Sequence, residues 1–291
     1  MVERQAGEPA SRVTPVLING EPEDCLSSLD RGLLYGDGVF ETLAVSGAQP
    51  RFWQRHMRRL REGCRRLNIP LPDEGRLHAE AHRLIAGCER CVLKVIITRG
   101  PGGRGYRAPP AATPTRVLQV SPWPGFPSAC RDCGVAIRLC SQRLGINPAL
   151  AGIKHLNRLE QVLARQEWDD PDIHEGLLCD TSGNVIEGTM SNLFVVHGEK
   201  LLTPDLARCG VAGIMRSVIL ELAGRLGIES VVRVLPLAEL EAADELFLTN
   251  GIIGIWPVIR LEQAGYRKGP ITRELQTQLA ELNTEGEAWH P

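Results

Sequence analysis

The sequence predicts an α+β fold with two domains, a smaller one at the amino end and a larger one at the carboxyl end. With 291 residues the chain exceeds the usual size of one domain, which is roughly 100 to 200 residues. A proline-rich segment at 121–127 would make a stiff connector, since proline cannot join the interior of a sheet. The expected strands and helices lack the regular βαβ repetition of a doubly wound sheet. Two domains would leave a cleft between them.

These features divide the chain into four segments. We expect a flexible tail over residues 1–12, a small domain over 13–121, a linker over 122–127 and a large domain over 128–291. The division depends mainly on the prolines of the linker.

The small domain should combine a sheet with two helices. Apolar residues recur at helical spacing over 53–67, which predicts an amphipathic helix with its arginines outside. A second helix is expected over 73–86. Strands are expected over residues 13–18, 39–45, 92–98 and 116–120. The first strand should end in a tight turn at Asn19-Gly20, and a glycine-punctuated loop at 30–38 leads into the second.

The large domain shows a mixed order of elements. Strands are expected over residues 135–139, 176–180, 192–196, 231–234 and 245–249. Helices are expected over 155–166 and 214–226, where apolar residues recur at helical spacing.

Charge and hydropathy exclude several classes of partner. The net charge is −2, so the chain has no broad basic footprint for nucleic acid. Residues 1–15 lack the apolar core of a signal peptide. No apolar run reaches the roughly 18 residues that a membrane span needs. We therefore expect a cytoplasmic protein that binds a small molecule and neither nucleic acid nor a membrane.

Nine cysteines without a secretory signal fit reduced thiols better than a disulfide framework. Two CxxC pairs, at 88–91 and 130–133, raise the alternative of a structural zinc site. The 38 residues between the pairs exceed the about 15 to 20 of ribbon-type sites. We therefore expect no metal, and buried or incidental thiols instead.

Lysine is rare in this chain, and that makes each lysine amine a candidate for chemistry. Only four of the 33 basic residues are lysines: Lys94, Lys154, Lys200 and Lys268. A guanidinium cannot form an imine, whereas the amine of a desolvated lysine can. Lys154 stands at the expected start of the helix over 155–166, behind Gly152. Taken alone, an ordinary exposed lysine is the simpler interpretation.

A carboxylate and an anion site follow along the chain. Glu187 lies on an expected strand between apolar neighbours, where a carboxylate needs a partner. A protonated pyridine nitrogen would suit it, and so would an arginine. Gly213 precedes the helix over 214–226, so the free N–H groups at that helix start could bind phosphate. Many helices begin with glycine and bind nothing, so Gly213 is informative only together with the other residues.

The spacing of these residues resembles the signature of the class IV, or fold type IV, pyridoxal-phosphate enzymes. Glu187-x4-Asn192-Leu-Phe, Leu201-x-Thr203 and Val211-x-Gly213-Ile-x-Arg216 carry the resemblance, which spans nearly the whole chain. The family includes branched-chain aminotransferases, D-amino-acid aminotransferase and aminodeoxychorismate lyase.

The resemblance implies the fold of D-amino-acid aminotransferase, with pyridoxal 5′-phosphate in the cleft, and a homodimer. Lys154 would form the Schiff base, and Glu187 would contact the pyridine nitrogen. The phosphate and its surroundings would involve Arg59, Gly213, Ile214, Met215, Asn250 and Ile252.

Within the family, residues 153–162 and 98–106 are most similar to aminodeoxychorismate lyase, and Thr42 matches a threonine found in the lyases. That likeness implies elimination of pyruvate from aminodeoxychorismate to leave 4-aminobenzoate, a step of folate biosynthesis. The freed amine of Lys154 would be the base, and Thr42 would assist the departing group. Arg104, Tyr106, Tyr35 and Phe40 are the expected substrate contacts. Glu41 departs from the paired threonines of some lyases.

Two alternatives stay open. A class IV aminotransferase would share every cofactor contact, and Phe40-Glu41 is a pair common among them. A non-catalytic relative that binds the cofactor is the second alternative, although Lys154, Glu187 and Arg59 occur together. Lys94 is the competing lysine for the cofactor.

Overall fold

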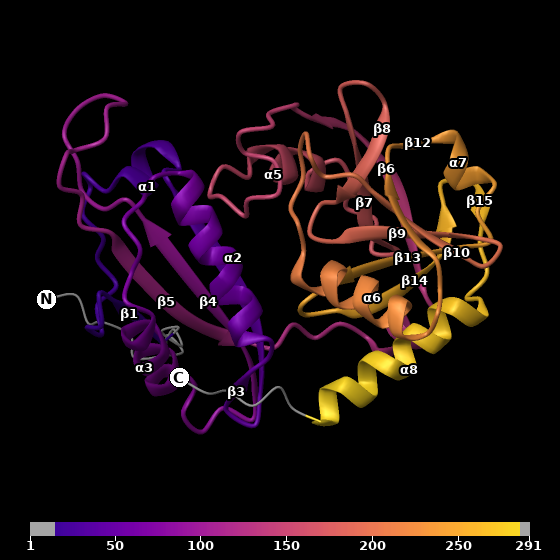
Figure 1. Ribbon diagram of the computed structural model, residues 1–291, viewed down its shortest axis with the longest axis horizontal. Coiled ribbons are helices and arrows are strands. Elements are labelled where there is room, and N and C mark those ends of the chain that lie inside the picture. Colours follow the sequence, from indigo (N-terminus) through magenta and orange to yellow (C-terminus); the bar gives the residue numbers. More distant parts are fainter. Residues whose placement is uncertain (1–14, 286–291) are drawn as a thin grey trace, which may run out of the picture.

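The computed structural model describes residues 15–285, which form two β-sheets flanked by helices (Figure 1). The sheet of the first half has five strands and lies at the indigo and purple side of the picture. The sheet of the second half has ten strands and lies at the orange and yellow side. This is the α+β architecture that the sequence predicts. The predicted tail, 1–12, lies outside the described residues.

The first sheet is antiparallel throughout, in the order β1-β5-β4-β2-β3. Its strands are β1 (Val16–Ile18), β2 (Gly38–Ser46), β3 (Gln49–Pro50), β4 (Arg90–Thr98) and β5 (Thr115–Pro122). Asn19 and Gly20 follow β1 with positive φ angles of 54° and 97°, as the predicted tight turn requires. β5 extends to Pro122, which pairs opposite Cys91. The rest of the predicted domain division stays a prediction.

Two helices pack on this sheet. They are α2 (Trp53–Arg66) and α3 (Glu74–Ile85), close to the predicted bounds. The side chain of Asp73 accepts a hydrogen bond from the N–H of Arg76 and so begins α3. Met57 and Leu60 of α2 are buried in one core with Leu43 and Leu93 of the sheet. This packing fixes α2 on the side of the sheet that faces the second half of the chain (Figure 1).

The segment 30–38 differs from the predicted loop because it contains a short helix, α1 (Arg31–Tyr35). The side chain of Asp30 accepts the N–H of Gly32 at its start. Gly36 ends the helix with φ 64°, a left-handed conformation that suits glycine. Local capping therefore converts part of this loop into a helical turn.

Strands of the second sheet close into a ring. In order, β9 pairs with β13, β13 with β14, β14 with β6, β6 with β7, β7 with β8, and β8 again with β9. These strands are β6 (Val135–Leu144), β7 (Ile173–Asp180), β8 (Asn184–Gly188), β9 (Asn192–His197), β13 (Glu245–Asn250) and β14 (Gly254–Leu261). The others are β10 (Lys200–Pro204), β11 (Ser230–Arg233), β12 (Leu235–Pro236) and β15 (Ala264–Gly265). The β8–β9 pairing that closes the ring joins Glu187 to Asn192.

Alternate residues of the ring strands enter two different cores. In β9, Leu193 and Val195 belong to one core, and Phe194 and Val196 belong to another. The second core also holds residues of α6 (Ile214–Arg225) and α8 (Pro270–Glu285), which cover the outside of the ring. The remaining helices are α4 (Ser128–Asp132), α5 (Leu159–Arg165) and α7 (Ala238–Glu241). Among residues 15–285, no helix combines the length and apolar character that crossing a bilayer requires.

The helix expected over 155–166 begins only at Leu159. The residues just before it are not helical, because their backbone groups bond to β2 in the first half of the chain. The N–H of Phe40 donates to the carbonyl of Lys154 at 2.9 Å, and the N–H of Leu156 donates to the carbonyl of Gly38 at 3.0 Å. Tertiary hydrogen bonds therefore override the local helix pattern and place Lys154 between the two sheets.

Candidate functional site

A cavity of about 810 Å³ opens between the two halves of the chain. Most of the predicted site residues line it: Phe40, Thr42, Arg59, Lys154, Glu187, Gly213, Ile214, Met215, Asn250 and Ile252. They come from β2, α2, the non-helical segment before α5, the ring strands and the start of α6. The fold thus brings together residues that are more than 200 positions apart in the sequence.

Lys154 presents its amine inside this cavity. Burial, together with the nearby positive charge of Arg59, lowers the pKa of the lysine from 10.5 to about 8. The amine nitrogen lies 4.4 Å from the centroid of the Phe40 ring. A lysine with this pKa has a substantial unprotonated fraction near neutral pH, and the unprotonated amine is the form that attacks an aldehyde.

Lys94, the competing lysine, lies on the neighbouring strand β4. Its amine nitrogen is 5.2 Å from the centroid of the same Phe40 ring. Lys94 does not line the cavity, whereas Lys154 does. The geometry therefore favours Lys154 as the amine that meets a ligand.

Glu187 is buried at the point where the ring of strands closes. Burial raises the pKa of its carboxyl group from 4.5 to about 7, although the charges of Arg158 and Lys154 act in the opposite direction. One carboxylate oxygen accepts a hydrogen bond of 2.8 Å from the N–H of Val211. The sequence also allowed an arginine as the partner of Glu187. Arg158 is near enough to influence Glu187 through its charge, but the described contacts include no hydrogen bond between the two side chains.

The side chain of Asn192 contacts both Glu187 and Val211. Its side-chain nitrogen donates to the carbonyl of Val211 at 2.9 Å and lies 3.5 Å from an oxygen of Glu187. The Glu187 carboxylate is therefore fixed in direction but retains capacity for a further donor from the cavity.

Arg59 is held by a buried carboxylate that the sequence did not single out as part of the site. Glu41 binds it through both oxygens, with Nε–Oε1 at 2.8 Å and Nη2–Oε2 at 2.5 Å. Burial alone would raise the pKa of Glu41, but the charges of Arg59 and His56 lower it to about 2. The third guanidinium nitrogen donates to the carbonyl of Ala212 at 2.9 Å, which aims Arg59 at the start of α6.

The start of α6 faces the cavity and carries no side-chain cap. The N–H groups of the first helical residues, Ile214 and Met215, have no partner within the helix. A Cβ on Gly213 would lie 2.0 Å from the Oδ1 atom of Asn192, so only glycine fits there. A helix start of this kind, next to Arg59, is an anion site.

Asn250, the last residue of β13, and Ile252, which follows the strand, also line the cavity. The side-chain oxygen of Asn250 accepts the N–H of Ile252 at 2.8 Å and that of Ile253 at 2.9 Å. The N–H of Ile252 is thus already engaged, which weakens its predicted role as a phosphate donor. Thr42 lines the cavity from β2, beside Phe40.

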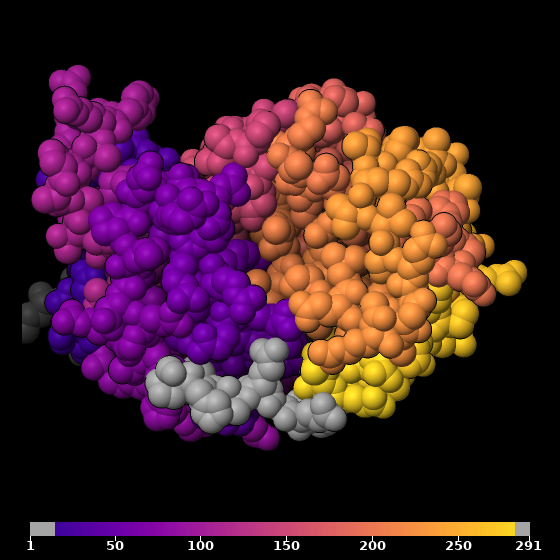
Figure 2. Space-filling model, viewed as in Figure 1, coloured from indigo at the N-terminus to yellow at the C-terminus, as the bar shows by residue number. Residues whose placement is uncertain are grey.

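Three predicted substrate contacts, Tyr35, Arg104 and Tyr106, do not line the cavity of their own chain. Arg104 and Tyr106 belong to the loop between β4 and β5, which projects from the molecule (Figure 2). Tyr106 is 87% exposed, and its ring contacts that of Tyr35 at 5.4 Å between centroids. The loop therefore carries these side chains away from Lys154.

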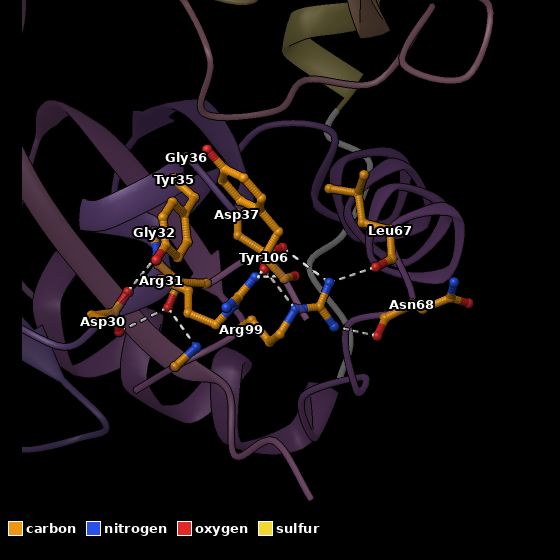
Figure 3. Close-up of polar contacts among 12 residues, drawn as sticks. Asp30, Arg31, Gly32, Tyr35, Gly36, Asp37, Leu67, Asn68, Arg99 and Tyr106 are labelled. Carbon is orange, nitrogen blue, oxygen red and sulfur yellow. Dashed lines mark hydrogen bonds and ion pairs between the residues drawn. The ribbon is translucent and has the colours of Figure 1, made fainter. Parts of the chain in front are cut away.

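The loop is held by a network of charges beneath it (Figure 3). Asp37 accepts hydrogen bonds from Arg31 at 2.9 Å and from Arg99 at 2.7 Å. The two outer nitrogens of Arg31 donate to the carbonyls of Gly105 and Tyr106, each at 2.9 Å. Hydrogen bonds from Arg31 of α1 therefore fix the position of the loop relative to the first sheet.

Sequence reasoning missed the parts of the site that act through other residues. Glu41 was noted only as a departure from the lyase pattern, and His56 was not singled out at all. Arg158 and Gln161, which also line the cavity, stood inside a quoted motif without a role. These residues could have been found as charged or polar side chains on otherwise apolar faces of strands or helices.

The two CxxC pairs belong to different parts of the fold. Cys88 lies just before β4 and Cys91 lies in it, whereas Cys130 lies on α4 and Cys133 just after it. Within the part of the chain that the structure describes, no three His, Cys, Asp or Glu side chains form a metal-binding group.

Comparison with known proteins gives a consistent set of relatives. The family model described as amino-transferase class IV matches residues 38–261. Aminodeoxychorismate lyase of Vibrio harveyi is 36% identical over 266 residues, which cover 90% of this chain and 98% of that protein. A putative branched-chain-amino-acid aminotransferase of Methanocaldococcus jannaschii is 31% identical over 280 residues, 93% of this chain and 96% of that protein. The crystal structure of 4-amino-4-deoxychorismate lyase from Pseudomonas aeruginosa is 49% identical, with a TM-score of 0.89, and covers 91% and 98% of the two chains.

Proposed function

Because this chain belongs to the class IV amino-transferase family, whose members use pyridoxal phosphate, we propose that it is a 4-amino-4-deoxychorismate lyase. The observation that carries the proposal is one cavity that combines the Lys154 amine, the Glu187 carboxylate and the anion site of Arg59 and α6. The lyases of Vibrio harveyi and Pseudomonas aeruginosa support the choice of reaction. Thr42, which lines the same cavity, agrees with it.

The residues of the cavity fit pyridoxal phosphate. Arg59 and the N–H groups of Ile214 and Met215 would hold the phosphate, and Gly213, where a Cβ would collide with Asn192, lets the helix start pack closely against that side chain. Glu187 would accept a hydrogen bond from the protonated pyridine nitrogen, because no arginine is hydrogen-bonded to it among the described contacts. Lys154 would attach to the aldehyde. When bound, the cofactor supplies an electron sink for carbanions next to the substrate nitrogen.

In the proposed reaction, the residues of this chain move and hold protons. The Lys154 amine removes the proton from the substrate carbon that bears nitrogen, for which a pKa near 8 is well matched. Glu187 keeps the electron sink protonated. Thr42 hydrogen-bonds the enolpyruvyl group as it leaves. The products, 4-aminobenzoate and pyruvate, together contain all atoms of the substrate, so no co-substrate is needed.

The experiment that tests the proposal compares two substrates. Purified protein loaded with pyridoxal phosphate should release equal amounts of pyruvate and 4-aminobenzoate from 4-amino-4-deoxychorismate, with no keto acid added. An aminotransferase, the function of the relative from Methanocaldococcus jannaschii by its description, would require a keto acid and would transfer the amino group. Keto-acid-dependent transfer without release of 4-aminobenzoate would replace the proposal.

We also propose that the enzyme works as a homodimer in which Arg104 and Tyr106 reach the cavity of the partner copy. The support is that their loop is fixed and exposed, while their own cavity lies elsewhere. Leu33, which is 64% exposed on the neighbouring α1, adds apolar surface beside the loop. Lys154→Ala and Arg104→Ala proteins should each be poorly active. Mixing and re-equilibrating them should restore activity, because a mixed dimer has one intact site.

A further inference from the structure

Glu175 is a buried carboxylate that the proposed reaction does not use. It lies on β7, is 1% exposed, and its side chain has no ion pair among the described contacts. Its two oxygens accept hydrogen bonds from these groups: the N–H groups of Gly176, Thr189 and Met190 and the hydroxyls of Thr189 and Ser191. Burial raises the pKa of the Glu175 carboxyl group, while these donors favour its charged form. The carboxylate is therefore surrounded by donors alone.

All but one of these donors belong to the turn between β8 and β9, residues 189–191. The turn lies directly on the carboxylate, since a Cβ on Gly188 would lie 2.9 Å from an oxygen of Glu175 and 2.3 Å from the hydroxyl oxygen of Ser191. The same turn forms a wall of the cavity. Glu175 therefore fixes the backbone of this turn through hydrogen bonds on the side away from the cavity.

The turn connects the two residues that orient the cofactor end of the cavity. Glu187 precedes it and Asn192 follows it, and these two residues form the bridge that closes the ring of strands. Asn192 in turn donates to the carbonyl of Val211, whose N–H donates to Glu187. A shift of the turn would therefore move both side chains relative to the cavity.

We infer that Glu175 is a positioning residue that holds the β8–β9 turn and, through it, sets the Glu187–Asn192 pair against the bound cofactor. The inference rests on the cofactor site of the proposed function and adds a residue behind it. Glutamine has nearly the same shape, but its NH₂ group would face a surrounding of donors. At least one hydrogen bond to the turn would be lost and a donor left without an acceptor.

The test measures cofactor binding and needs no lyase activity. Glu175→Gln apoprotein is titrated with pyridoxal phosphate, and the pH titration of the near-visible absorption band is recorded for the loaded protein. The control is Glu80→Gln, which alters a buried carboxylate paired with Arg116 in the first sheet, at 2.7 Å. Glu175→Gln should weaken binding about tenfold, as one lost buried hydrogen bond predicts, and should shift the midpoint of the band. Glu80→Gln should leave both quantities at the wild-type values.

A role in folding alone gives a different result. The apoprotein of Glu175→Gln would then melt at a lower temperature, but its cofactor affinity and band titration would equal those of the wild type, which would overturn the inference. Should Glu175→Gln not fold, Ser191→Ala removes one donor of the turn and should shift both readouts in the same direction by less; unchanged readouts there also overturn the inference. Wild-type protein that binds the cofactor but releases no 4-aminobenzoate would refute the lyase proposal and leave this result standing.

Discussion

Glu41 binds Arg59 through both carboxylate oxygens, at 2.8 Å and 2.5 Å, and both side chains belong to the first half of the chain. The pairing fixes a guanidinium that points across the cavity to the carbonyl of Ala212 in the second half. A planar arginine held in this way is already oriented for a phosphate before the ligand arrives.

The first prediction follows from this pair. Glu41→Gln should lower the affinity for pyridoxal phosphate by roughly tenfold or more, because the neutral amide offers Arg59 one uncharged acceptor oxygen in place of the two oxygens of the carboxylate. Equilibrium dialysis of the apoprotein measures the effect. Glu62→Gln is the matched control, since Glu62 pairs with Arg65 on the exposed side of α2. Equal dissociation constants for both variants would mean that Glu41 does not orient the phosphate site.

The second prediction concerns the two lysines near Phe40. Lys154→Ala protein mixed with pyridoxal phosphate should lack the near-visible band of a lysine-bound cofactor, because its amine is gone. Lys94→Ala should keep the band, since Lys94 lies outside the cavity. Absorbance spectra and reduction with borohydride followed by peptide mapping check the result. A band that disappears with Lys94 and persists without Lys154 would reverse the assignment.

The third prediction is a pH dependence of cofactor attachment. The Lys154 amine reacts only when unprotonated, and its pKa is lowered to about 8. The rate of band formation should therefore rise with pH, roughly tenfold for each unit below 8, and level off above it. Stopped-flow absorbance at constant ionic strength measures the rate. A rate that keeps rising up to the ordinary lysine pKa of 10.5 would show that burial does not tune this amine.

The fourth prediction uses Glu187 and the stability of the apoprotein. Its folded-state pKa of about 7 exceeds the ordinary 4.5, so between these values the folded protein keeps a proton that the unfolded chain has released. The free energy of unfolding should fall as pH rises through this window, by up to about 1.4 kcal/mol for each unit. In Glu187→Gln this contribution is absent. Urea unfolding of both proteins at the two ends of the window gives the difference, and parallel pH profiles would contradict it.

The fifth prediction compares two glycines of the α6 region. Gly213→Ala should abolish tight cofactor binding, because the new methyl group would collide with Oδ1 of Asn192, 2.0 Å away. Gly224→Ala, at a position of the same helix with open space around it, should bind the cofactor normally and be more stable by about 0.5–1 kcal/mol. Calorimetric titration and thermal melting check both variants. Normal binding by Gly213→Ala would argue against the anion site at this helix start.

Local patterns in the sequence predicted the helices well where tertiary structure agrees with them. α2 and α6 begin at the predicted residues, Trp53 and Ile214, because their apolar faces meet sheets. The segment after Lys154 fails this condition: its residues bond to β2, so the helix begins at Leu159. Backbone pairing of that kind depends on distant strands and leaves no trace in a window of neighbouring residues.

The site could be predicted only where its residues follow a local sequence pattern. Glu187 and Gly213 occur in a motif with fixed spacing, the resemblance that this motif carries implied Lys154, and the structure brings all three to one cavity. The tasks of Glu41 and Glu175 depend on which side chains lie opposite them across the fold, and spacing does not reveal that. The loop with Arg104 was placed with the substrate by its likeness to the lyases, and the Asp37 network holds it outside the cavity of its own chain, so its contact with the substrate stays a prediction.

The ring of strands is fastened between β8 and β9 by a single pair, Glu187 and Asn192. A ligand that binds Glu187 from the cavity would therefore stabilise the shortest strand pairing of the ring. Protein with bound ligand should open between β8 and β9 less often than protein without it. Ligand binding should therefore protect these two strands from proteolysis and amide exchange more than it protects the outer helices.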